Sequence, residues 1–157
     1  MKAITIIQPW ATLIAIGEKK YETRSWSTNH RGQLAIHAGK QIDLVACERE
    51  PIKSTLAKHG YTANNLPAVA VVALCNLEEC YKVDNRPEYG TIGLQANNGK
   101  FRVWGGKRDN EYYFGDYTDG RFAWELTSIE ILDPPIPAKG MQGLWNWDGD
   151  HNAGQGS

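Results

Sequence analysis

The chain has 157 residues and a net charge of −1, with a sequence pI near 6.4. This balance excludes a global basic field that would attract nucleic acid, so any anion site has to be local. The longest apolar run, 68–74, is too short to span a membrane, and the first residues lack the apolar stretch of a secretion signal. We therefore expect a cytoplasmic protein with no membrane partner.

The length suits one domain with a sizeable core, which we expect over residues 1–147. Residues 148–157 are polar and rich in glycine, and we expect a flexible tail there. The sequence contains no internal repeat and no linker-like stretch that would divide the chain.

No residue pattern in the chain predicts a metal ion or a cofactor. The three cysteines, Cys47, Cys75 and Cys80, lack the Cys-x-x-Cys spacing of a zinc site, and the four histidines are scattered. Gly-rich phosphate loops and the Gly-x-Ser-x-Gly nucleophile motif are missing as well. We expect no metal, no cofactor and three reduced thiols that are buried or half-buried.

A strand followed by a short helix opens the chain. Residues 2–8 are rich in β-branched side chains and predict a strand. Pro9 suits the first position of a helix, where a missing N–H costs nothing, and apolar residues follow it at helical spacing. Gly17 can adopt the left-handed conformation that ends a helix. Such a short helix depends on tertiary packing.

Residues 20–26 predict an unusual strand, because period two puts Glu22, Arg24 and Trp26 on one face. One interpretation is a solvated edge strand with a surface Glu22–Arg24 pair, worth well under about 1 kcal/mol. The other is the charged floor of a cleft, with Trp26 at its rim and a lysine from the preceding turn above it. Spacing alone leaves both interpretations open.

The next part of the chain predicts scaffold. Residues 33–37 predict a short strand, in which we expect His37 to be a hydrogen-bonded structural residue. Residues 41–60 predict two helical pieces separated at Pro51. Charged side chains in this segment, Arg49 among them, are expected at ordinary solvated positions.

The apolar run 68–74 predicts a buried strand that continues to Glu78 and Glu79. We expect these two acids to be solvated at the end of the strand. A partly desolvated carboxylate at this place would suit a general base, which is the alternative interpretation.

Residues 81–120 show no clear periodicity, which is typical of a functional insertion in a compact domain. We expect loops, a helical turn near 88–94 and a hairpin around 101–104. The aromatic side chains of this stretch either offer stacking surfaces for bases or form a small satellite core. They include Tyr112, Tyr113, Phe114 and Tyr117.

A strand is expected again over residues 121–132, and the three prolines within 134–137 are expected to end regular hydrogen bonding. The glycines of residues 138–147 allow tight turns before the last apolar side chains pack back. This order of elements suits an α+β domain built on a mostly antiparallel barrel with helices packed outside.

Three short motifs follow one another near the N-terminus. They are Gln8-Pro9-Trp10-Ala11, Gly17-x-Lys19-x-x-Glu22-x-Arg24-x-Trp26 and His30-Arg31-Gly32. Together with residues 36–40 they resemble the ASCH domain, the activating signal cointegrator homology domain, a branch of the PUA-like superfamily. The Gly-x-Lys-x-x-Glu-x-Arg run is the specific signal, and a looser likeness continues through 68–79 and 122–147.

The resemblance implies an α+β fold with a PUA-like, mostly antiparallel β-barrel and helices packed outside. It also implies a cleft for RNA, other single-stranded nucleic acid or a nucleoside. Lys19 and Arg24 would hold phosphate there, and an indole would stack on an unpaired base. Glu22 would accept from an exocyclic amine or hold Arg24. By this likeness the ligand-binding residues are Gln8, Trp10, Lys19, Glu22, Arg24, Trp26, His30, Arg31 and Lys40.

Two other functions stay open at this point. Some members of the family are amidohydrolases that deacetylate N4-acetylcytidine with a Lys, a Thr and a Glu, and a ribonuclease role has also been proposed. Lys19 matches the catalytic Lys, but Glu22 occupies the position of the catalytic Thr. The only candidates for the catalytic Glu are Glu78 and Glu79. As an enzyme the protein would use Lys19 and Glu22. The third function is a protein-interaction module with an exposed apolar patch within 104–117.

Overall fold

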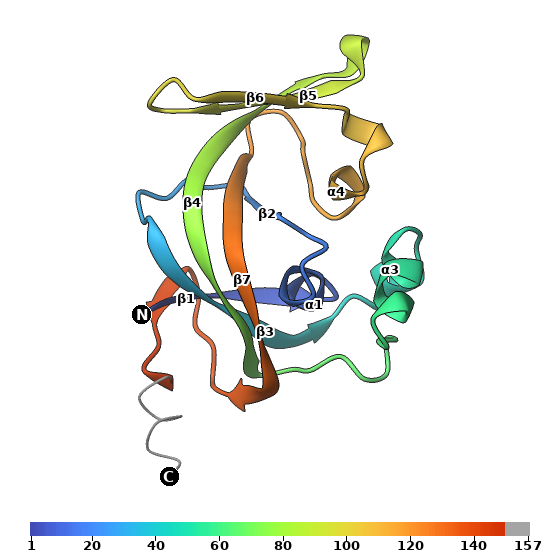
Figure 1. The fold of residues 1–157 in the computed structure, drawn as a ribbon, viewed down its shortest axis with the longest axis vertical. Helices are drawn as coiled ribbons and strands as arrows, with labels where there is room; N and C mark the ends of the chain where they lie inside the picture. Colours follow the sequence, from blue (N-terminus) through green and yellow to red (C-terminus); the bar gives the residue numbers. More distant parts are fainter. Residues whose placement is uncertain (150–157) are drawn as a thin grey trace.

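One strongly curved sheet organises residues 1–149, the part of the chain that this computed structural model describes (Figure 1). The tail expected over 148–157 therefore lies almost entirely outside the described residues. The strands are β1 (Lys2–Gln8), β2 (Tyr21–Arg24), β3 (Gly32–Ile42), β4 (Ala70–Arg86), β5 (Thr91–Ala96), β6 (Phe101–Trp104), β7 (Phe122–Pro137) and β8 (Leu144–Asn146). The helices are α1 (Trp10–Ala15), α2 (Leu44–Cys47), α3 (Ile52–Lys58) and α4 (Asn110–Tyr113), with 3-10 turns at Pro87–Tyr89 and Gly106–Arg108.

The expected α+β class and mostly antiparallel pairing are confirmed, since β1–β3 is the one parallel pair among the described strands. The expected closed barrel is wrong. The strand order is β2-β7-β4-β3-β1-β8, and no pairing within residues 1–149 joins the two ends. The reason is local, because β8 pairs with β1 at Lys2, Ala3 and Ile4 and no strand covers the rest of that edge. An open seam therefore separates β2 from the second half of β1.

The sequence predicted helices packed outside the sheet, but not all of them lie there. α1 lies within the curve of the sheet and contacts β1, β3, β4 and β7, while α3 lies to one side of it (Figure 1). Every residue of α1 after Trp10 is buried, so packing holds this six-residue helix. Gly17 follows the helix at φ 83°, the left-handed conformation that its position required.

Two strands are longer than their sequence patterns suggested. β4 continues past Glu79 to Arg86, and β7 runs through the prolines that were expected to end it, with Ile136 paired to Val71. Register shifts interrupt the β4–β7 ladder in three places. Proline lacks an N–H donor and is tolerated at such irregular positions, so the strand survives.

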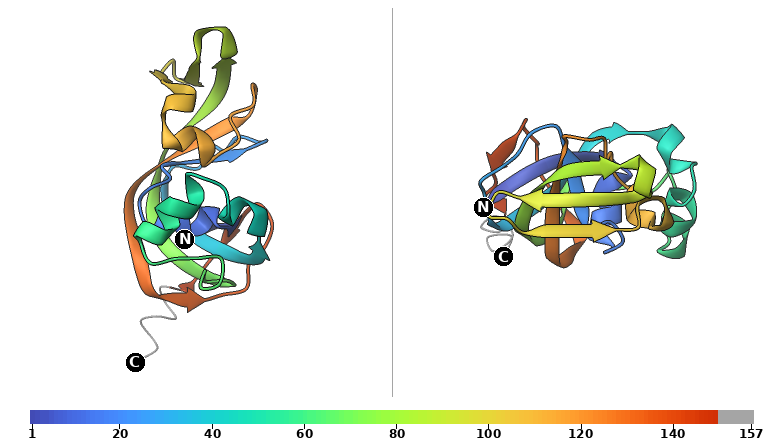
Figure 2. Two further views of the ribbon diagram at one scale, coloured as in Figure 1. Left: turned by 90° about the vertical axis from the view of Figure 1, so that its right-hand side faces the viewer. Right: turned by 90° about the horizontal axis from the view of Figure 1, so that it is seen from above.

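The stretch 81–120 contains more regular structure than its composition indicates. The predicted hairpin is confirmed, since β6 spans Phe101–Trp104 and pairs with β5. The helical turn is shorter than expected and ends at Tyr89, because Thr91 already begins β5. We call residues 82–108 the arm. It rises above the rest of the molecule at one end of the curved sheet (Figure 2).

The aromatic side chains of the insertion divide between the two interpretations. Tyr117 and Phe114 are buried and belong to cores, and Tyr112 packs against the same core as Tyr117. Tyr113 is 44% exposed. Most of this cluster is therefore a satellite core that fastens the arm and α4 to β2, and Tyr113 remains free for other contacts.

His37 is a structural residue, as its strand position predicted. Its Nε2 lies 2.6 Å from the carbonyl oxygen of Ala138, which can only accept, so this nitrogen carries the proton. Its Nδ1 then accepts from Thr5 Oγ1 at 3.1 Å, and Thr5 Oγ1 accepts from Trp145 Nε1 at 3.1 Å. Burial lowers the pKa of His37. The neutral ring thus joins three strands and the C-terminal segment.

The three cysteines are free and buried. Burial raises the pKa of Cys75 to about 12, which makes this thiol a poor nucleophile. Residues 1–149 contain no group of three or more His, Cys, Asp or Glu side chains placed to hold a metal ion. No helix in this range has the length and apolar character needed to cross a bilayer.

We expect Gly140→Ala to destabilise the protein by about 1–3 kcal/mol, because the added Cβ meets a packed network. That Cβ would lie 2.5 Å from Thr5 Oγ1 and 2.6 Å from the His37 ring. Urea denaturation measures the effect. The control is Lys139→Ala at the exposed neighbouring position, which should change stability by less than about 0.5 kcal/mol. Equal stability of the two variants would contradict the packing argument.

Candidate functional site

A cavity of about 610 Å³ lies beside β2, in the seam between this strand and the second half of β1. Its walls come from β1, β2, α1, α3 and the residues around the end of α4. The lining side chains include four cations, two acids and four aromatic rings. They are Lys19, Arg24, Arg49, Arg121, Glu22, Asp116, Trp10, Trp26, Tyr113 and Phe114.

Lys19 is the most buried charged group of the cavity wall, with 1% of its surface exposed. The turn after α1 places it there, since the backbone N–H of Lys19 donates to the carbonyl of Leu13 at 3.0 Å. Its Nζ donates to the carbonyl of Phe114 at 2.6 Å and lies 3.9 Å from Glu22 Oε1. Burial lowers the pKa of Lys19, and the carboxylates of Glu22 and Glu111 oppose that change. The site therefore holds an amine that gives up its proton more readily than a surface lysine.

Glu22 and Arg24 lie on the cavity side of β2 and form a direct pair. Arg24 Nε donates to Glu22 Oε2 at 2.8 Å, and the Glu22 side chain is 9% exposed. A second guanidinium nitrogen of Arg24 donates to the carbonyl of Thr5 at 2.9 Å. Arg24 thus ties β2 to β1 across the open seam. This arrangement matches the cleft-floor interpretation of the strand.

The wall opposite β1 is fixed to β2 by side-chain hydrogen bonds. The carboxylate of Glu111 accepts from the backbone N–H groups of Lys20 at 2.8 Å and Tyr21 at 3.3 Å. Burial raises the pKa of Glu111, and the nearby charge of Lys19 lowers it in part. Thr23 Oγ1 accepts from the N–H of Asp116 at 2.9 Å. Residues 111–116 therefore cannot leave the cavity without breaking these bonds.

Aromatic side chains border the charged floor. Trp26 is 36% exposed, and its ring meets Trp124 edge-on at a centroid distance of 4.9 Å. Trp124 is fully buried, so it holds the exposed indole in one place. Trp10 is half-buried and Tyr113 is exposed on other walls of the cavity. These flat faces are available to a planar ligand.

Four of the nine residues named from the sequence lie elsewhere. Gln8 is fully buried and bonds Thr12 and the carbonyl of Pro67, so it organises the start of α1. His30 bonds the carbonyl of Gln33 within its own turn. Arg31 pairs with Glu79 at 2.5 Å. Lys40 is exposed near the end of β3 and does not line the cavity.

Glu78 and Glu79 do not line the cavity either. Glu78 accepts from Asn76 at 2.6 Å and Thr127 at 3.0 Å on the surface of the sheet. Burial raises the pKa of Glu79, but hydrogen bonds from the Cys80 N–H and from Arg31 outweigh this and lower it. The acids that line the cavity are Glu22 and Asp116.

Sequence reasoning missed several lining residues. Arg49 is exposed, as expected, but it also lines the cavity, because α3 packs beside α1. Arg121, Asp116 and Tyr113 come from the end of the insertion, which returns to β2 through Thr23. These residues are far from Lys19 in the sequence, so no local pattern could predict that they share a site with it. The fold alone brings them together.

Comparison with known protein families gives one match. Residues 4–100 match the family model of the ASCH domain, which covers more than half of the chain. The matched range includes β1, α1 and β2 and therefore Lys19, Glu22 and Arg24. A search of curated proteins finds no matching sequence.

The lowered pKa of Lys19 predicts a specific pH dependence of stability. Between that lowered pKa and the ordinary value of 10.5, the unfolded chain keeps a proton that the folded protein has lost. Stability due to Lys19 therefore rises with pH across this window, by up to about 1.4 kcal/mol per pH unit. Lys19→Met should lack this rise, as measured by urea denaturation in small pH steps.

The wild-type protein is the reference for this measurement. Buried tyrosines with raised pKa values also titrate at high pH, and they lower stability as the pH rises, in both proteins. Subtracting the two pH curves leaves the contribution of Lys19. A flat difference curve would show that Lys19 is no more acidic in the folded protein than in the unfolded chain.

Loss of the Arg24 contacts should weaken the fold. We expect Arg24→Met to cost about 1–3 kcal/mol, since it removes two hydrogen bonds and leaves Glu22 buried beside an apolar group. Arg86 and Asp84 form a matched control, because they also pair two residues apart on one strand but are exposed. Arg86→Met should cost less than about 0.5 kcal/mol. Equal losses of stability for the two variants in urea denaturation would contradict the conclusion that Arg24 stabilises the fold across the seam.

Proposed function

The chain belongs to the ASCH domain family, and from this premise we propose that it binds single-stranded nucleic acid, RNA above all, with an unpaired nucleotide in the Lys19–Glu22–Arg24 cavity. The observation that carries the proposal is the cavity itself. It combines cations and exposed aromatic faces in one concave site of a protein that has no global positive charge. A volume of about 610 Å³ falls in the range of small-molecule sites, about 300–1,000 Å³.

The cations of the site support phosphate binding. Arg24 and Arg121 are oriented by hydrogen bonds to neighbouring backbone carbonyls, which leaves part of each guanidinium facing the cavity. Arg49 is exposed, and its side chain has no ion pair within residues 1–149. Guanidinium groups bind phosphate oxygens in a bidentate manner, so this set suits a phosphodiester.

The aromatic and acidic groups support binding of an unpaired base. Trp26 and Tyr113 present exposed rings, and stacking of a base on such a ring is worth about 1–3 kcal/mol. Glu22 has one carboxylate oxygen on Arg24 and the other 3.9 Å from Lys19, so it can still accept from a donor. An exocyclic amine of a base is such a donor. A base inside a duplex cannot reach this position.

A hydrolase is the second candidate function, and burial of Lys19 is the observation that favours it. An amine with a lowered pKa is suited to proton transfer, and Glu22 lies beside it. A hydroxyl is also present, since Thr23 lines the cavity next to the position where N4-acetylcytidine amidohydrolases carry theirs. In that reaction water would cleave the amide C–N bond and release cytidine and acetate. The ASCH family is linked to both kinds of activity.

The third function considered, a protein-interaction module, has less support in the region where it was expected. Trp104 and Tyr117 pack into the satellite core and do not form an exposed patch. The exposed side chains of this kind nearby are Tyr113 of α4, which lines the cavity, and Phe101 and Val103 of β6.

Binding of nucleoside monophosphates and short single-stranded RNA tests the proposal. We expect Arg49→Ala/Trp26→Ala to lower affinity for both ligands by about tenfold or more, because a phosphate contact and a stacking face are lost. Both side chains are exposed enough to be removed without disturbing the core. The matched control is Arg108→Ala/Tyr89→Ala, which removes an exposed arginine and an exposed ring outside the cavity. Its affinity for a monophosphate should equal that of the wild type.

Wild-type protein that binds neither ligand at low salt would refute the proposal. The same samples with N4-acetylcytidine, followed by mass spectrometry, separate binding from catalysis. Cytidine that appears with the wild type and disappears with Lys19→Met would establish the hydrolase instead.

A further inference from the structure

The arm, residues 82–108, carries a local charge that differs from that of the whole protein. It contains six Lys or Arg residues and two acids, whereas the complete chain has a net charge of −1. Arg102 is engaged in structure, because it pairs with Glu125 and donates to Tyr21. Lys82 and Lys100 are exposed, and neither has an ion pair within residues 1–149. Lys100 stands opposite Ala96 on the side of the satellite core, so only Lys82 shares the face of Phe101.

The register of the arm separates its side chains into two faces. Val83, Leu94 and Arg102 stand opposite one another across β4, β5 and β6 and face the satellite core. The neighbouring set is Lys82, Gln95 and Phe101, which therefore points the other way. No other element covers that outer face when the molecule is seen from above (Figure 2).

The outer face carries exposed apolar side chains as well as charge. Phe101 is 56% exposed and Val103 is 57% exposed, and Tyr89 at the tip is 69% exposed. The ring of Phe101 rests against Gly93, where even a Cβ would come within 3.3 Å of it. One side of this ring is thus supported by backbone and the other is open to solvent. A supported ring is a platform on which a planar group can stack at little cost in entropy.

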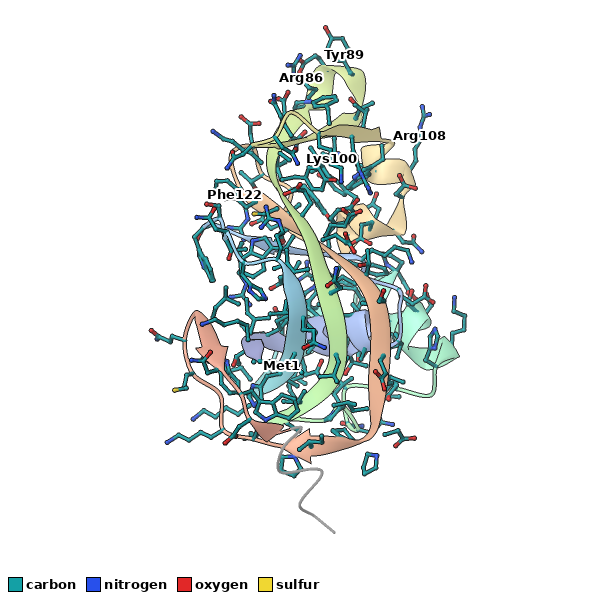
Figure 3. All side chains as sticks on the ribbon, turned by 60° about the vertical axis from the view of Figure 1, so that its left-hand side comes forward. Met1, Arg86, Tyr89, Lys100, Arg108 and Phe122 are labelled. Carbon is teal, nitrogen blue, oxygen red and sulfur yellow. The ribbon has the colours of Figure 1, made fainter. Side chains whose placement is uncertain are left out.

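The same sheet face leads from the cavity to the arm. Arg24 stands opposite Phe122, Phe122 opposite Lys82, and the row continues through Gln95 to Phe101. Figure 3 labels Phe122, which belongs to this row, and Arg86 and Tyr89 nearer the tip of the arm. Four strand-to-strand steps of about 4.8 Å make the path roughly 19 Å long. Roughly six stacked nucleotides at about 3.4 Å each would cover it.

We propose that the outer face of the arm binds the continuation of a single-stranded nucleic acid whose unpaired nucleotide occupies the cavity. Lys82 contacts a phosphate, and Phe101 stacks on a base. This inference rests on the proposed function, and it extends the binding site from one nucleotide to a segment of strand.

The chemistry of the face favours nucleic acid over a protein. The row from Arg24 to Phe101 carries two cationic groups, Arg24 and Lys82, and two rings, Phe122 and Phe101. Cations and aromatic rings are the two elements that single-strand-binding surfaces combine. A protein that added a strand to the free edge of β6 would bind backbone groups, and the cations of β4 would contribute nothing to it. A polyanion with flat bases uses both kinds of side chain.

A length series of oligouridylates, with uridine 5′-monophosphate as the shortest member, tests the inference. With the wild type, affinity should rise with length up to roughly six nucleotides. The arm variant Lys82→Ala/Phe101→Ala should lose this rise, which amounts to about tenfold or more for the longest ligand. The slope of log K against log salt concentration should fall by about 0.7, since one phosphate contact is removed.

The matched control is Lys139→Ala/Met141→Ala, which removes one exposed lysine and one exposed apolar side chain away from the arm. It should retain the wild-type length dependence. The arm variant should bind the monophosphate as the wild type does, which also shows that it is folded.

Each remaining outcome overturns a particular claim. An arm variant with unchanged length dependence and salt slope overturns the inference and leaves the outer face to a protein partner. In that case monophosphate binding, if present, still supports the cavity. A wild type that binds no monophosphate at all overturns the proposed function, whatever the arm does.

Discussion

The contacts of Arg24 are the constraint on which the rest of the structure depends. The sheet of this protein does not close, and across its open seam the guanidinium donates to a carboxylate of its own strand and to a carbonyl of β1. One side chain thus replaces part of a missing ladder of backbone hydrogen bonds. Because it bridges the seam at one point, space remains on either side, and that space is the cavity. The same residue sets the shape of the fold and the position of the site.

Burial of Lys19 follows from that arrangement. The amine is almost completely shielded from solvent, with one carbonyl oxygen at 2.6 Å and one carboxylate oxygen at 3.9 Å. A charged amine in such a place depends on Glu22 and Glu111 to offset its lost hydration. Both carboxylates are themselves held by other groups, Glu22 by Arg24 and Glu111 by backbone N–H donors. The site is therefore a connected set of charges, in which a ligand phosphate or a lost proton changes the balance for every member.

The sequence patterns predicted much of the local structure, but they did not predict that the sheet stays open. Gly17 correctly ended α1, because this depends on neighbouring residues only. Glu22, Arg24 and Trp26 all line the cavity, but Thr23 and Ser25 line it too, and β2 already ends at Arg24. The prediction of a barrel was wrong because closure of the sheet depends on how far β8 extends along β1. β8 pairs with only three residues of β1, and the sequence pattern does not show the length of this pairing. Gln8 and Arg31 were named from motif positions but satisfy their hydrogen bonds elsewhere. Arg49 and Arg121 reach the cavity from distant segments, which single-sequence periodicity cannot detect.

For the proposed function, the position of the arm supplies a way in which a nearly neutral protein would attract a polyanion. Long β4 belongs to the main sheet at one end and to the arm at the other, so one strand face passes from the protein interior to solvent. Apolar side chains such as Leu77 occupy that face where it is covered, and Lys82 occupies it where the cover ends. Lys82 stands two strands from Arg24 of the cavity, and the acid two residues further along that face, Asp84, is paired with Arg86. With a Debye length of about 8 Å at physiological salt, such local charge acts on a bound strand more strongly than the net charge of the chain does. The fold can therefore favour a strand that follows the sheet face over polyanions that approach from elsewhere.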